Sequence, residues 1–324
     1  MPRNKQHKPP PAPRPSPTHF LALPINTPSQ RAQLEESLGK FRDAVVINDL
    51  GATTSRNAAQ PPTTRGASGD ATTDKALMRA VGADNAPTSP HESSTHANEE
   101  TRVVPPGAVR PVGTIHFTLG VMHLPTPSDV ERAVAFLQNL DLALLTSLGS
   151  PTPQQQQQPF AIDLVGLKPL PSASKATVLF IEPAAGASRE RLQRLVQGVK
   201  DAFVKAEPAS LMMEERKGRE EVLLHATVVN TVYARKGARN GNGRGRVTMD
   251  VRALVGGEEQ EGQERVERNW GNSVWAKGVE VGRLCICEMG AEKVRAPRTG
   301  MSTGKERAVV DERYREVTGV NIPW

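Results

Sequence analysis

One four-residue frame occurs twice in this chain, inside two runs rich in Val, Ile, Leu and Thr. Ile115–Thr118 and Leu224–Thr227 both read apolar–His–x–Thr. The composition of both runs is typical of buried β-strands. Successive side chains of a strand point to opposite faces, so the His and the Thr of each frame share a face. This constrains the fold, because a face that carries His and Thr should meet a cleft rather than a layer of helices.

A histidine with a hydroxyl beside it suits acid–base chemistry on a phosphate. A neutral imidazole takes a proton, an imidazolium gives one, and a hydroxyl can hold a phosphoryl oxygen. A single His-x-Thr is more often a hydrogen-bonded core feature, but its repetition in two strands indicates a duplicated lobe. We predict that His116 and His225 are catalytic and that Thr118 and Thr227 bind phosphate.

The segments around the two frames resemble a known family. Together they are similar to the 2H phosphoesterase superfamily and, more narrowly, to the AKAP7-type phosphoesterase domain of activating signal cointegrator 1 complex subunit 1. The segments that carry the resemblance are Thr18–Ile25, Thr114–Gly120, Leu224–Thr231, Trp275–Glu280 and Cys285–Gly290.

The resemblance implies a fold and an activity. The expected fold is α+β, a bilobal LigT-like arrangement of two pseudo-symmetric antiparallel sheets backed by helices around a central groove. The expected reaction is hydrolysis of 2′,3′-cyclic phosphodiester ends of RNA or nucleotides by a His/His acid–base pair without a cofactor. Which of His116 and His225 is the acid stays open.

The narrower resemblance also implies partners. It suggests a subunit related to the ASC-1 complex of transcription regulation and DNA repair, with a helicase subunit as partner and a nuclear, possibly also cytoplasmic, location. An alternative is a non-catalytic RNA- or nucleotide-binding scaffold subunit of such a helicase-containing complex. Residues 1–17 contain no GXXG loop, so RNA binding through a KH domain is not expected.

Charge and cysteine content narrow the function classes. The net charge of +6 favours an anionic partner. Cys285 and Cys287 lie too close for an ordinary disulfide, and the chain has no further cysteine for a zinc site. We expect both to be reduced packing residues, and no metal site is expected. No apolar run approaches the ~18 residues of a membrane span.

The low-complexity stretches set the expected domain boundaries. Residues 1–17 are expected to be a disordered basic arm, and residues 18–324 the phosphoesterase domain. Disordered or low-complexity insertions are expected at about 51–106, 151–159 and 235–268. The last begins with a Gly-rich basic run that is either a solvated hairpin insertion or a flexible RNA contact. Its candidate RNA-contacting residues are Arg235, Lys236, Arg239, Arg244 and Arg246.

Periodicity and capping signals predict several elements around these frames. A helix after Thr27 has its buried stripe at Leu34, Leu38, Phe41 and Val45. Ser128 and Glu131 form the expected capping box of a later helix. We also expect strands at 222–232 and 279–289 and a short last strand at 314–317.

Overall fold

The computed structural model describes most of the chain between its low-complexity stretches. The described ranges are 15–47, 102–147, 160–213, 221–234, 247–256, 269–296 and 308–324. The expected insertion at 151–159 lies outside them, as do most of the basic arm and nearly all of the insertion at 51–106. Residues 247–256, which fall within the third expected insertion, include a short helix, α6 (Arg252–Val255).

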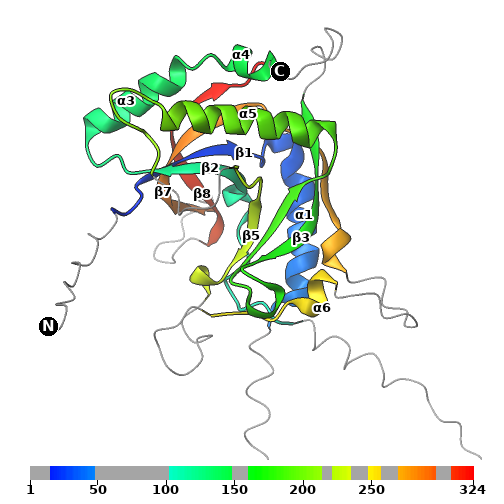
Figure 1. Ribbon diagram of the computed structural model, residues 1–324. Helices are drawn as coiled ribbons and strands as arrows, with labels where there is room; N and C mark the ends of the chain where they lie inside the picture. The colour runs from blue at the N-terminus through cyan, green and yellow to red at the C-terminus, as the bar shows by residue number, and fades with distance from the viewer. Residues whose placement is uncertain are drawn as a thin grey trace, which may run out of the picture.

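Eight strands form one sheet in the order β6-β3-β4-β5-β2-β1-β7-β8 (Figure 1). Each neighbouring pair is antiparallel. Together with the helices, this confirms the predicted α+β class. The strands are β1 (His19–Pro24), β2 (His116–Met122), β3 (Ala161–Leu170), β4 (Val178–Pro183), β5 (Ala226–Asn230), β6 (Val274–Glu280), β7 (Arg283–Arg295) and β8 (Val309–Asn321).

The two expected sheets are joined edge to edge. Strands β6, β3, β4 and β5 make one half of the sheet, and β2, β1, β7 and β8 make the other. The two halves meet where β2 pairs with β5, and the register there consists of the single pair Phe117–Ala226. The two His-x-Thr frames therefore lie side by side at the junction of the halves.

The helices cover one face of this sheet. They are α1 (Pro28–Val45), α3 (Pro127–Gln138), α4 (Leu142–Ser147) and α5 (Ala187–Val204). In Figure 1, α3 and α5 run across the top of the molecule and α1 lies beside β3. α1 packs against β6, whereas α5 contacts both β2 and β3 and so bridges the two halves.

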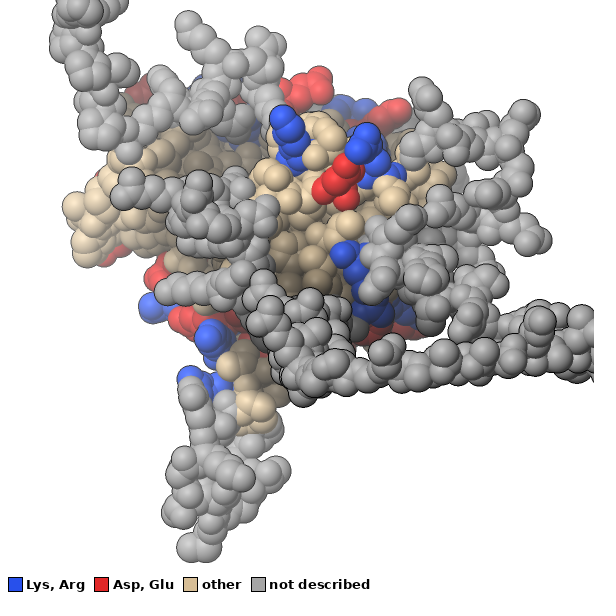
Figure 2. All heavy atoms as spheres, turned by 90° about the horizontal axis from the view of Figure 1, so that it is seen from below, with Lys and Arg blue, Asp and Glu red and all other residues tan. Residues whose placement is uncertain are grey.

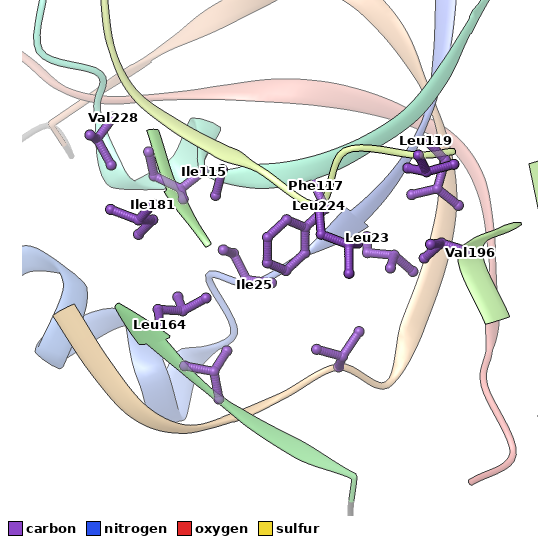
Figure 3. Packing of buried hydrophobic residues seen from close by; sticks show 14 of the residues in the cluster. Leu23, Ile25, Ile115, Phe117, Leu119, Leu164, Ile181, Val196, Leu224 and Val228 are labelled. Carbon is purple, nitrogen blue, oxygen red and sulfur yellow. The ribbon is translucent and has the colours of Figure 1, made fainter. Parts of the chain in front are cut away.

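The main core lies between these helices and the sheet. Phe117 and Leu119 of β2 and Leu224, just before β5, point into it together with Leu23 and Val196 (Figure 3). The predicted α1 stripe is confirmed, because each of its four side chains is at most 2% exposed; these are Leu34, Leu38, Phe41 and Val45. Burying such side chains removes apolar surface from water at roughly 1.5–3 kcal/mol each.

A second, smaller apolar cluster lies apart from the main core. It consists of Phe20 and Ala22 of β1 with Cys285 and Cys287 of β7, and Tyr314 of β8 packs against it. The cysteines are free and buried, as predicted. Burial raises the pKa of both thiols above the ordinary value, so they stay protonated.

Four local predictions differ from the structure. The strand expected at 279–289 is divided between the end of β6 and the start of β7. The α3 capping box is formed by Thr126 and Asp129 rather than Ser128 and Glu131, because Pro127 occupies the first helical turn. The second motif strand begins only at Ala226, which leaves His225 just before it. The last strand spans Val309–Asn321, much longer than 314–317, because it pairs with the length of β7.

No helix in the described ranges is both long and apolar enough to cross a membrane.

Candidate active site

The β2–β5 pairing brings the four predicted site residues together. Phe117 and Ala226 are paired and fully buried, so their side chains face the main core. The residues on either side of them point to the opposite face. Continuing the register by one residue puts His116 across from Thr227 and Thr118 across from His225. Side chains in such positions have Cβ atoms roughly 5 Å apart, and all four residues are half-buried.

The backbone fixes the same tautomer in both imidazoles. His116 Nδ1 lies 2.8 Å from the carbonyl oxygen of Thr114, and His225 Nδ1 lies 2.7 Å from that of Leu223. A carbonyl oxygen only accepts, so Nδ1 carries the proton in each ring and donates it two residues back. In the neutral form, Nε2 of each ring is then unprotonated and can take up a proton.

The hydroxyls of the two frames differ in their contacts. Thr118 Oγ1 lies 2.9 Å from His116 Nε2, and in the neutral ring this hydroxyl donates to the nitrogen. Among the described residues, neither His225 Nε2 nor the Thr227 hydroxyl has a recorded hydrogen-bond partner. In the first frame the histidine and the threonine therefore bond to each other, whereas in the second frame both groups are open to a ligand.

His116 is held in an apolar, aromatic surrounding. Its ring centroid lies 4.9 Å from that of Phe20 and 5.2 Å from that of Tyr314. This enclosure lowers the pKa of His116 to about 4, chiefly because burial disfavours the charged ring. The bond to the Thr114 carbonyl opposes that effect, whereas the nearby charges of His225 and Arg110 add to it. His116 is therefore neutral near pH 7.

Three residues that the sequence did not single out border the His116 half of the site; they are Arg110, Tyr233 and Tyr314. Arg110 lies with its guanidinium carbon 3.7 Å from the ring centroid of Tyr233 and, at 5% side-chain exposure, is buried. Tyr314 hydrogen-bonds to Tyr233 and Arg110, and its pKa is raised to about 12, first by burial and then by Tyr233. The sequence held one signal for Tyr233 and Tyr314, because they are the only two tyrosines of the chain.

The surroundings of His225 are more polar. Its ring lies 5.5 Å from that of Phe180, and continuing the pairing of Ile181 with Ala226 sets Glu182 beside it. The Glu182 carboxylate is held by Lys168 Nζ at 2.5 Å and by an Arg189 guanidinium nitrogen at 3.3 Å. An ion-paired carboxylate thus lies beside His225, whereas aromatic rings lie beside His116.

The candidate RNA-contacting residues lie outside the described ranges; they are Arg235, Lys236, Arg239, Arg244 and Arg246. On the described surface turned to the viewer in Figure 2, Lys and Arg side chains are interspersed with Asp and Glu. In the ranges that the structure describes, no group of three or more His, Cys, Asp or Glu side chains is placed to hold a metal ion.

Solved structures resemble this chain only distantly. One is Escherichia coli LigT complexed with 3′-AMP, 12% identical, with a TM-score of 0.38 over 94% of this chain and 98% of that one. A structure described as a phosphoesterase gives 12% identity and a TM-score of 0.37 over 95% and 99% of the two chains. The protein TT0787 of Thermus thermophilus gives 13% identity and a TM-score of 0.31 over 67% and 83%.

A family model gives the clearer relationship. No curated protein matches the chain. The model described as the AKAP7 2′5′ RNA ligase-like domain matches residues 92–295, which contain both His-x-Thr frames. That match spans more than half of the 324 residues. The chain therefore belongs to the AKAP7 2′5′ RNA ligase-like domain family.

Proposed function

We propose that this protein is a phosphodiesterase that hydrolyses 2′,3′-cyclic phosphate ends of RNA or nucleotides by acid–base catalysis. The observation that carries the proposal is the Phe117–Ala226 pair, which sets both His-x-Thr frames on one face. Family membership supports it. Two imidazoles with the same tautomer and two hydroxyls then point to the same side of the sheet, and there we place the phosphate of the substrate.

The two histidines take different roles in this proposal. His116, neutral near pH 7, accepts a proton from the attacking water through Nε2. The water oxygen bonds to phosphorus, the bond from phosphorus to one ribose oxygen breaks, and His225 in its protonated form gives that oxygen a proton. Exchange with solvent resets both rings. The Thr118 and Thr227 hydroxyls donate to the non-bridging oxygens, which gain charge in the transition state.

The free protein needs one rearrangement before this reaction. The Thr118 hydroxyl donates to His116 Nε2 in the unliganded site. A phosphate oxygen, which accepts more strongly than a neutral imidazole, draws that hydroxyl away. Substrate binding therefore frees the nitrogen that has to take the proton.

The test is hydrolysis of an oligoribonucleotide that ends in a 2′,3′-cyclic phosphate, with the 2′- or 3′-phosphate as measured product. His116→Ala and His225→Ala should each lower turnover by about 10²–10⁴-fold, because each removes a proton-transfer group. The matched control is His123→Ala, which removes an exposed histidine outside the site. Thermal melting checks that each variant is folded. Wild-type activity in a folded His116→Ala or His225→Ala protein rules this mechanism out.

The association with an ASC-1-type complex, its helicase subunit and the nucleus is a proposal that depends on sequence resemblance, chiefly in residues 18–25, 114–120 and 224–231. A pull-down with the helicase subunit, run beside the hydrolysis assay, separates an enzyme from a scaffold. Capture of the helicase without any turnover favours the non-catalytic alternative.

A further inference from the structure

An exposed aromatic ring lies beside the proposed catalytic site and has no role in the chemistry. Tyr233 belongs to the short 3-10 helix Thr231–Tyr233 that follows β5 directly. Its side chain is 44% exposed, although one face of its ring is covered by the guanidinium of Arg110 at 3.7 Å. The exposed part of the ring therefore lies on the other face and at the edge.

Arg110 is fixed from several sides and makes a rigid support. Its backbone N–H donates to the carbonyl of Val228 at 2.8 Å, which ties the segment to β5. Its guanidinium lies 3.4 Å from a carboxylate oxygen of Glu312 and also bonds to Tyr314. Because both the support and the Tyr233 ring are ordered before a ligand arrives, a molecule that stacks on the ring loses little binding free energy to their ordering.

The ring is also connected to the catalytic histidine. Tyr233 hydrogen-bonds to Tyr314, and the ring of Tyr314 contacts that of His116 at 5.2 Å between centroids. The Tyr233 side chain is thus separated from His116 by one side chain, that of Tyr314. This spacing suits a ligand that has a phosphate at one end and a flat group at the other.

We propose that the open face of Tyr233 is a stacking platform for the nucleobase of the substrate. The inference rests on the proposed function and names its substrate class: a cyclic phosphate that carries a base, rather than any cyclic phosphodiester. A tyrosine ring with a guanidinium behind it offers a flat π-surface to a base, and such stacking accepts every base. We therefore expect a strong preference for nucleotides but little preference among the four bases.

The experiment compares two substrates that differ only in the base. One is adenosine 2′,3′-cyclic phosphate, and the other is methyl ribofuranoside 2,3-cyclic phosphate, which has a methoxy group instead of the base. Tyr233→Ala should raise KM for the adenosine substrate about tenfold and leave kcat and the base-free substrate nearly unchanged. Tyr233→Phe keeps the ring and should keep the wild-type KM. Tyr314→Phe controls for loss of the bond between the two tyrosines.

The outcomes separate this inference from the proposed function. If Tyr233→Ala impairs both substrates equally, or if wild-type protein does not prefer the adenosine substrate, the platform is disproved while the hydrolase stands. If wild-type protein turns over neither substrate, the proposed function fails. The platform is then tested by binding alone. Wild-type protein should bind adenosine 3′-monophosphate about tenfold more tightly than ribose 3-phosphate, and Tyr233→Ala should remove that difference.

Discussion

The two His-x-Thr frames share a local geometry but sit in different surroundings. In both, Nδ1 donates to the carbonyl two residues upstream, which leaves Nε2 of the neutral ring without a proton. His116 is enclosed by Phe20, Tyr314 and the nearby charge of Arg110. Among the described residues, His225 has the aromatic neighbour Phe180, and it lies next to the ion-paired Glu182.

In the proposed mechanism, this contrast lets one repeated motif supply two different chemical groups. An acid–base pair needs one neutral and one protonated imidazole at the same pH. Enclosure in an apolar cluster disfavours the charged form of His116, and a positive His225 would disfavour it further. In the proposed mechanism, the two frames can take different roles without any difference within the motif, because their surroundings differ.

The largest effect that sharpens this comparison is expected at the threonines. Thr118→Val and Thr227→Val keep the shape of the side chain and remove a donor to the phosphate, so each should lower kcat by about 10²-fold. Thr118→Ser and Thr227→Ser keep the hydroxyl and should retain most activity. Steady-state kinetics on the cyclic-phosphate RNA end measure both pairs. Val variants as active as the wild type would show that the hydroxyls do not hold the phosphate.

A smaller effect is expected in stability against pH. The pKa of His116 falls from 6.5 to about 4 on folding, so between these values the unfolded state binds more protons. The contribution of His116 to the free energy of unfolding is then fully present above pH 6.5, and it is lost as the pH falls towards 4. Allowing for partial solvent exposure, we expect a loss of about 1–2 kcal/mol.

Urea unfolding across this pH range measures that loss. His116→Gln should flatten the stability curve, because a glutamine has no proton to gain. His123→Gln, the control outside the site, should keep the wild-type slope. An unchanged slope in His116→Gln would mean that enclosure does not keep this imidazole neutral.

Local patterns in the sequence predicted what depends on neighbours along the chain. The α1 stripe and the shared face of His and Thr follow from helix and strand periods, and the two free cysteines follow from their close spacing. The α+β class came from the resemblance together with these elements. The capping box of α3 was predicted at the wrong residues, because several Ser and Thr residues near Pro127 compete for the same helix start.

The sequence did not predict the contacts that depend on strand pairing between distant segments. Arg110 reaches the site because its segment pairs with β5, and Tyr314 reaches it because β8 follows β7 for most of its length. Neither residue lies in a motif, and no period connects them to His116. The joining of both halves through one residue pair is likewise a property of sheet register rather than of any local pattern.

The division of roles between His116 and His225 is tested most directly with a leaving group that needs no proton. Thymidine 3′-(4-nitrophenyl) phosphate has no 2′-hydroxyl, so water must attack, and 4-nitrophenolate departs without an acid. If His225 is the acid and His116 the base, His225→Ala should recover most of the wild-type rate on this ester while remaining inactive on the cyclic-phosphate RNA end. His116→Ala should be inactive on both. Recovery in His116→Ala, or equal loss in both variants on both substrates, would contradict the account.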